Sequence, residues 1–201
     1  MPLKDARIGF ALTGSHCTIP VIWAKLEALI AEGAEIYPIL SMVVMETDTR
    51  FGRAAEIMER LTRLCGRKPW TDLVEVEAIG PKKLLDIIVV APCTGNTLAK
   101  LAHGISDSTV TLACKAHLRN RRPIVIAIST NDGLSGNAPN LGVLLARKCY
   151  YFVPFGQDNP EGKSCSLLAK MDLLPAAVDA ALEGRQIEPI LVEFPAGQGN
   201  K

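Results

Sequence analysis

The chain has 201 residues, of which 48% are hydrophobic and 21% charged, and its formal net charge is +1. This length suits one α/β domain with a well-filled core, and we expect a single domain over residues 1–201. A charge so close to zero gives no electrostatic reason to expect nucleic acid or an anionic membrane as a partner. No apolar run approaches the roughly 20 residues that a membrane-spanning helix needs.

Six cysteines are scattered along the chain, without a C-x-x-C pair or a histidine at ligand spacing. In a chain of this size that carries no signal peptide, such a pattern is typical of reduced thiols and not of a disulfide framework or a zinc site. We therefore expect a cytoplasmic protein without a metal centre.

A first strand is predicted at residues 7–12 (RIGFAL), a short apolar run that ends at a Thr-Gly-Ser turn. A helix is predicted from about residue 18, because apolar residues then recur at helical spacing, and Gly33 ends it. The second strand is predicted at 35–40 (EIYPIL), where Pro38 favours the end of a strand or the edge of a sheet.

Residues 41–50 are predicted to form a long loop, and 54–64 a helix. The strongest strand prediction is 86–91 (DIIVVA), since a continuous apolar run is typical of a parallel strand covered on both faces. Helices are predicted at 97–103 and 108–118.

Another central strand is predicted at 123–128 (PIVIAI), followed by a loop at 131–139 that is rich in Gly, Asn and Pro. A helix at 141–147, a strand at 150–153 and a closing amphipathic helix at 167–182 complete the series. Such alternation implies an α/β fold, with a parallel sheet and helices on both of its faces. The tail from about residue 188 has little pattern and is expected to be extended or flexible.

Three polar segments follow apolar strands, and each is rich in Gly, Ser, Thr and Asn. They are TGSHCT (13–18), APCTGNT (91–97) and ISTNDGLSGN (128–137). Any one of them is equally well explained as a turn or a helix cap. In parallel sheets, however, ligands bind beyond the carboxyl ends of the strands, so three such segments on one edge favour a binding site. Neither G-x-G-x-x-G nor G-x-x-x-x-G-K-[ST] is present, which leaves a mononucleotide phosphate as the possible nucleotide ligand.

Residues 86–107 (DIIVVAPCTGNTLAKLAHGISD) resemble the flavoprotein family of homo-oligomeric flavin-containing cysteine decarboxylases. The family pattern is an apolar strand, Pro-Ala-Ser-Ala-Asn-Thr, a short helix and Gly-Ile-Ala-Asp. The matching positions here are Pro92, Asn96, Thr97, Lys100, Gly104 and Asp107, with Thr94 where the family has Ser. The family's Ala-Pro-Ala-Met-Asn block corresponds to residues 127–131 (AISTN), of which only the ends match, and the similarity covers roughly residues 6–155.

The resemblance implies a flavodoxin-like (Rossmann-like) fold, a three-layer sandwich around a central parallel sheet, with FMN as cofactor and a homo-oligomeric assembly. Within the family the likeness is to a branch of spore-forming bacteria whose members act with a partner subunit. That pair oxidises dihydrodipicolinate to dipicolinate (pyridine-2,6-dicarboxylate) during sporulation, with NADP held by the partner. The resemblance thus implies a role in an oxidoreductase complex in the cytoplasm of the mother cell.

The resemblance also implies a pocket for a flavin and a carboxylate. The positions it assigns to FMN are Thr13, Gly14, Ser15, Ser41, Pro92, Thr94, Asn96 and Thr97. The positions it assigns to a small dicarboxylate substrate are Asn96, Asp107 and Asn131. No catalytic acid or base follows from it.

Two departures from the family pattern bear on the reaction. The decarboxylases use a histidine in the region after the second strand, and this chain has none there. Thr130 stands in place of the Met of the Met-Asn block. Both argue against a decarboxylase, which stays as one alternative. The other alternative is a non-catalytic scaffold protein with a vestigial pocket.

The remaining reactive side chains have simpler interpretations. His16 lies in the first polar turn, where a ligand contact and a turn or capping role are both open, whereas His103 and His117 fall on predicted helices as structural or solvated residues. Cys93 and Cys114 have no visible base beside them, and a buried cysteine that only packs is commoner than a nucleophile.

Overall fold

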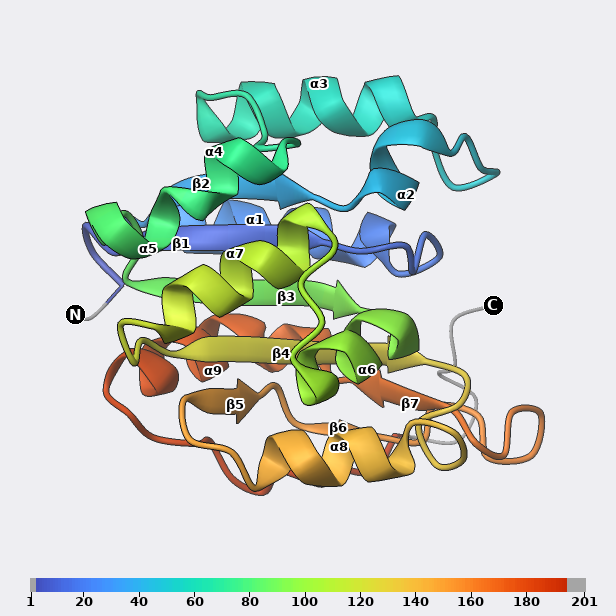
Figure 1. Ribbon diagram of the computed structural model, residues 1–201. Helices are drawn as coiled ribbons and strands as arrows, with labels where there is room; N and C mark the ends of the chain where they lie inside the picture. The colour runs from blue at the N-terminus through green and yellow to red at the C-terminus, as the bar shows by residue number, and fades with distance from the viewer. Residues whose placement is uncertain (1–2, 195–201) are drawn as a thin grey trace.

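The computed structural model describes residues 3–194, in which strands and helices alternate along the chain (Figure 1). Among these residues the parallel strands are β1 (Arg7–Leu12), β2 (Glu35–Leu40), β3 (Ile87–Cys93), β4 (Ile124–Thr130) and β5 (Tyr150–Phe152). They stand in the order β2-β1-β3-β4-β5, which is the flavodoxin-like order, with its switch point between β1 and β3. The predicted α/β fold with a central parallel sheet is confirmed.

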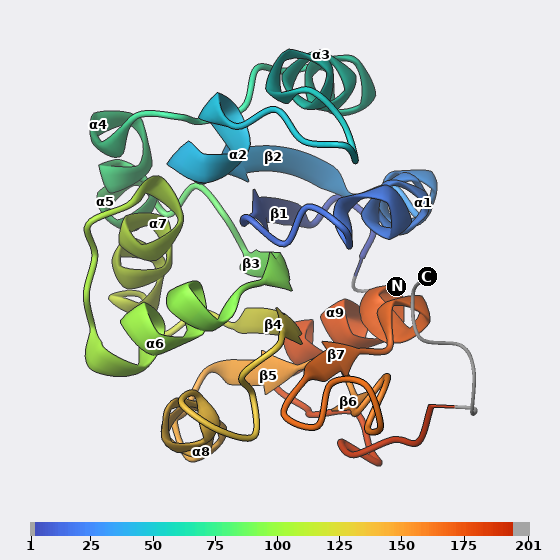
Figure 2. The same cartoon turned by 90° about the vertical axis from the view of Figure 1, so that its right-hand side faces the viewer.

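Helices cover both faces of this sheet (Figure 2). On one face lie α1 (Ile19–Ala31) and α9 (Leu174–Leu182). On the other lie α4 (Leu73–Glu77), α5 (Ile79–Lys82), α6 (Gly95–His103), α7 (Thr109–Leu118) and α8 (Ala138–Leu145). At the β2 edge are α2 (Met42–Glu46) and α3 (Ala54–Cys65). None of the helices that the structure describes is long and apolar enough to cross a membrane.

The centre of the sheet is buried on both faces, as its continuous apolar sequence predicts. Every residue of β3 is buried, and in β4 only Thr130 is partly exposed. Each buried Ile or Val side chain here contributes about 1.5–3 kcal/mol of transfer free energy. Pro38 lies in β2, the edge strand, in agreement with the expectation for a residue that cannot donate to a sheet ladder.

Two segments differ from the prediction. Residues 41–50 are not a continuous loop, because α2 begins directly after Ser41. Residues 167–182 are not one helix: β7 (Leu167–Ala169) pairs antiparallel with the end of β4 and with β6 (Phe155–Gly156). A 3₁₀ turn (Met171–Leu173) follows, and α9 starts only where Pro175 occupies its first turn. The sheet is therefore mostly, not wholly, parallel.

The segment after residue 188 contacts β6 through one parallel bridge between Leu191 and Phe155. The amide of Phe155 donates to the carbonyl of Ile190, and the amide of Val192 donates to the carbonyl of Phe155, both at 3.0 Å. A Cβ on Gly156 would collide with the Val192 carbonyl, so glycine is needed there. The rest of the predicted tail, residues 195–201, lies outside the described residues.

Candidate functional site

A cavity of about 610 Å³ lies at the carboxyl ends of β1, β2 and β3, and we call it the first cavity. Its size falls within the range of small-molecule sites. Its lining residues are Thr13, Gly14, Ser41, Met42, Val43, Met45, Glu46, Thr71, Leu73, Thr94, Asn96, Thr97, Lys100, Asp107, Ser108 and Thr109. The structure thus brings together seven of the predicted positions: Thr13, Gly14, Ser41, Thr94, Asn96, Thr97 and Asp107.

Thr13 joins the ends of the two strands at the switch point. Its side chain is only 1% exposed. The hydroxyl donates to the carbonyl of Pro92 at 2.6 Å and accepts from the amide of Thr94 at 3.0 Å. Pro92 is buried in β3, next to a shift in the β3–β4 register, and lines neither this cavity nor the one described below. Pro92 therefore supports the site from beneath and does not line it.

The N-terminus of α6 opens into the first cavity. Thr94 caps this helix, because its hydroxyl oxygen accepts from the amide of Thr97 at 3.3 Å. Asn96 lines the cavity, and its amide, in the first turn, has no partner within the helix and is available to a ligand. Gly95 has to be glycine, since a Cβ there would lie 2.6 Å from a carboxylate oxygen of Asp132.

Ser41 carries the clearest sign that the first cavity takes a ligand. Its amide donates to the Leu12 carbonyl at 3.1 Å, and its carbonyl accepts from the Val44 amide at 3.0 Å, so the backbone is fixed between β2 and α2. Its hydroxyl oxygen is buried and has no hydrogen-bond partner among residues 3–194. Leaving a buried polar group unpaired costs about 1–3 kcal/mol, a cost that a bound oxygen or phosphate would remove.

The charges of the first cavity are balanced internally. The ammonium of Lys100 lies 2.8 and 2.9 Å from the two carboxylate oxygens of Asp107. A hydrogen bond from Lys100 holds the pKa of Asp107 below its usual value. Glu46 adds a further acidic side chain to the lining. Among the described residues, an anionic group in this cavity is therefore left with uncharged donors.

The mouth of the first cavity is apolar. Met42 is 60% exposed, Val43 51% and Leu73 43%. All three line the cavity. Polar groups at the strand ends and apolar side chains at the mouth suit a ligand with a flat aromatic part and a polar end.

Ser15 and Asn131 lie in a separate cavity of about 540 Å³, the second cavity. Its lining residues are Ser15, Cys17, Thr18, Pro20, Val21, Arg50, Phe51, Ser129, Thr130, Asn131, Asp158, Lys163, Ser166, Leu167 and Leu168. The consecutive residues Gly14 and Ser15 thus line different cavities, because the Ser15 hydroxyl turns toward that of Ser129, 2.7 Å away. The turn after β1 forms part of the wall of each cavity.

Reactive side chains elsewhere are inert in this environment. Burial raises the pKa of the Cys114 thiol to about 12 and raises that of Cys93 as well, so neither is a thiolate near neutral pH. His117 is 1% exposed, and its Nε2 lies 3.1 Å from the carbonyl oxygen of Pro123. Both ring nitrogens of His16 are buried without a partner among the residues that the structure describes, and this burial lowers its pKa.

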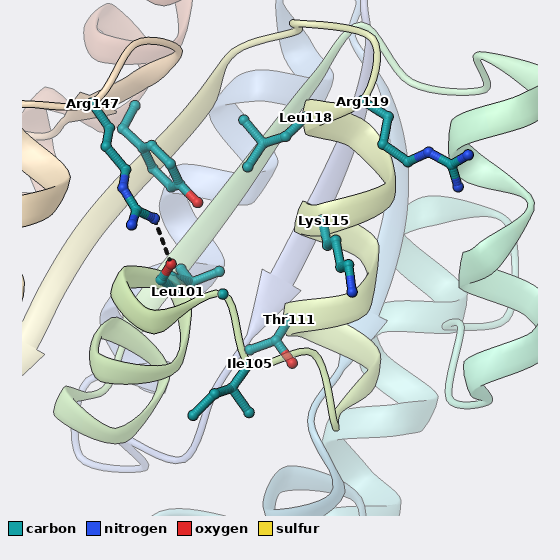
Figure 3. Close-up of a pocket in the computed structure, with 9 residues that line it drawn as sticks. Leu101, Ile105, Thr111, Lys115, Leu118, Arg119 and Arg147 are labelled. Carbon is teal, nitrogen blue, oxygen red and sulfur yellow. Dashed lines mark hydrogen bonds between the residues drawn. The ribbon is translucent and has the colours of Figure 1, made fainter.

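A third cavity, of about 320 Å³, lies between α6, α7 and β5 (Figure 3). Arg147 lines it, but its guanidinium donates to the carbonyls of Leu101 and Ala102 at the end of α6. Arg119 points away from Arg147 in the same view. The cations of this cavity do not converge, and Arg147 serves to satisfy the last carbonyls of a helix.

Several lining residues were not predicted. Ser129 lies within a polar segment that the sequence marked, but Arg50 and Lys163 lie on loops without any local pattern. Helices α4 and α5 were also missed, although Asp72 and Glu75 form a capping box that marks the start of α4.

Comparison with known proteins identifies the family of this chain. A family model described as Flavoprotein matches residues 2–139. The B subunit of dipicolinate synthase from Bacillus subtilis (strain 168) is 48% identical over 191 residues, which is 95% of this chain and 96% of that protein. The crystal structure of the corresponding B subunit from Bacillus halodurans matches with a TM-score of 0.89 at 42% identity, covering 97% of this chain and 100% of that one.

A more distant structure shares the fold. DmrB from Burkholderia xenovorans, solved in complex with FMN, matches with a TM-score of 0.65 at 21% identity, covering 89% of this chain and 96% of that one. The chain belongs to the flavoprotein family. Within the family it is a close homologue of the B subunit of dipicolinate synthase, one component of an enzyme. The resemblance found in residues 86–107 is confirmed.

Proposed function

We propose that this chain acts with the A subunit of dipicolinate synthase to oxidise dihydrodipicolinate to dipicolinate, and that its first cavity holds FMN. Homology to the B subunit of that enzyme supports the reaction. The observation that supports the cofactor is the buried hydroxyl of Ser41 at the carboxyl edge of the sheet, which has no partner in the described part of the chain. The proposed setting is the cytoplasm of a sporulating mother cell.

The residues of the first cavity fit a flavin mononucleotide. The Ser41 hydroxyl and the first-turn backbone amide of Asn96 are donors for a phosphate or a carbonyl oxygen. The amide of the exposed Asn96 side chain can donate to the polar edge of the ring. Met42 and Leu73 offer apolar surface to the ring faces. Bound FMN would supply a redox group at the sheet edge.

The proposed oxidation requires an oriented substrate more than it requires acid or base groups. Dihydrodipicolinate loses two electrons and two protons when its ring becomes aromatic, one hydrogen leaving as hydride and the other as a proton. The oxidant is NADP on the partner protein, which takes up the hydride equivalent. Since aromatic stabilisation drives the step, the contribution of this chain is to hold the dicarboxylate in a fixed position.

A homo-oligomer is part of the proposal. Met42, Val43, Leu73 and Val74 are 60%, 51%, 43% and 76% exposed, and the first three line the first cavity. Exposed apolar side chains gathered at the mouth of a site favour a protein surface that covers it. Family likeness supports a second copy of this chain or the NADP-binding partner protein as that surface.

Titration of the purified chain with FMN tests the cofactor. We expect flavin absorbance to stay with the protein at about one flavin per chain, and we expect Asn96→Ala to bind FMN roughly fivefold more weakly, the effect of losing one hydrogen bond. Excess FMN that fails to bind would overturn the flavin assignment. Reduction of NADP that proceeds with the partner protein alone would overturn the role in the reaction.

A further inference from the structure

The second cavity carries more positive than negative charge. Arg50 and Lys163 line it, with Asp158 as the single acidic lining residue. The carboxylate of Asp158 already accepts a hydrogen bond from the hydroxyl of Ser166 at 2.7 Å. Neither Arg50 nor Lys163 forms a salt bridge with any residue between 3 and 194. Both charges are therefore available to an anion from outside.

Three hydroxyl groups gather in the wall of the same cavity. The Ser129 hydroxyl lies 2.7 Å from that of Ser15 and 2.8 Å from that of Thr18, and the last two are 3.2 Å apart. Ser129 is 7% exposed and Thr18 is 2% exposed. Thr18 precedes α1 without capping it through its side chain. Because hydroxyl protons rotate freely, the cluster can turn a donor toward a carboxylate oxygen without moving the backbone.

The two cavities differ in what they offer a dianion. In the first cavity, Lys100 is held by Asp107, and Glu46 adds a negative charge that forms no salt bridge with any residue between 3 and 194. In the second cavity, two cations have no acidic partner among the described residues and three hydroxyls lie together. A ligand with two carboxylates therefore finds two cationic partners in the second cavity, whereas an anionic group in the first cavity meets uncharged donors.

We propose that the second cavity binds a small dicarboxylate through Arg50, Lys163 and the hydroxyl cluster of Ser15, Thr18 and Ser129. This inference rests on the proposed function and deepens it, because it moves the substrate to a different cavity from the cofactor. Of the positions that the family resemblance implies for the dicarboxylate, Asn131 lines the second cavity, whereas Asn96 and Asp107 line the first. The substrate then lies across the Gly14–Ser15 turn from the first cavity.

The test uses dipicolinate, the stable aromatic product, titrated by calorimetry into the full chain. We expect dipicolinate to bind, with picolinate, which has one carboxylate, at least tenfold weaker. Arg50→Gln and Lys163→Gln are each expected to weaken dipicolinate binding about fivefold or more, and Arg50→Lys less than Arg50→Gln. Lys148→Gln, at an exposed position before β5, is the control and is expected to bind as the parent does.

Titrating the same variants with FMN distinguishes the two dianions that the second cavity could bind, a dicarboxylate and the phosphate of a flavin. Unchanged FMN affinity in Arg50→Gln and Lys163→Gln supports the dicarboxylate site. If both variants lose FMN affinity as much as dipicolinate affinity, the second cavity binds the phosphate and the proposal fails. A parent chain that binds no dipicolinate also overturns it. If the parent chain binds dipicolinate but no FMN, the dicarboxylate site stands and only the proposed FMN cofactor is overturned.

Discussion

Replacing Ser41 with alanine is expected to weaken FMN binding about tenfold, the usual worth of a hydrogen bond to a charged group, while the folded protein stays at least as stable as the parent. The two effects have one cause. The hydroxyl is buried without a partner among residues 3–194, so its removal takes away an unpaired polar group and leaves the backbone bonds of Ser41 intact. Absorbance titration with FMN and thermal unfolding of the same preparations measure both quantities.

A second variant at this position strengthens the test. Ser41 is the N-cap residue of α2 but makes no side-chain cap hydrogen bond, so Ser41→Asp brings a carboxylate to this position, and thermal unfolding checks that the variant is folded. Its carboxylate would repel a phosphate at the same place, and FMN binding is expected to fall more than about a hundredfold. Ser135→Ala, an exposed serine outside both cavities, serves as the control. If Ser41→Ala lowers the melting temperature and keeps FMN affinity, the hydroxyl is structural.

Local sequence patterns predicted much of the fold. Residues 87–91 (IIVVA) form a central parallel strand because a continuous apolar run can only be buried on both faces. The polar segments after β1 and β3 meet because the carboxyl ends of parallel strands share an edge. Thr13, Asn96 and Asp107 could therefore be placed in one cavity from the sequence and the family resemblance, without coordinates.

The features that were not predicted from the sequence depend on contacts between residues that are distant along the chain. Leu167 and Leu168 fit a helical pattern, yet they pair with Thr130 and Ser129, a partnership that no local signal encodes. The separation of Ser15 from Gly14 depends likewise on Ser129, 114 positions away. Polar side chains in loops have no periodicity, so which of them face a cavity is decided by tertiary packing.

Acid is expected to destabilise this protein through His117 before most of its carboxylates are protonated. Burial lowers the pKa of His117 from 6.5 to about 4, with the hydrogen bond to the Pro123 carbonyl opposing that shift in part. Between these two values the unfolded chain takes up a proton that the folded chain does not. The free energy of unfolding is therefore fully retained above about pH 6.5 and falls as the pH drops toward about 4, by about 3 kcal/mol at about 1.4 kcal/mol per pH unit.

The contribution of His117 can be isolated by difference. His117→Gln keeps a side-chain donor for the Pro123 carbonyl and cannot be charged, so its unfolding free energy lacks this pH dependence. Urea unfolding of both chains between pH 7 and pH 4 is expected to show the parent losing about 3 kcal/mol more than the variant over that range. Carboxylates and His16 titrate in both chains and cancel in the comparison. Parallel curves for parent and His117→Gln would mean that the folded protein accommodates a charged imidazole beside β4, which the packing around His117 does not allow for.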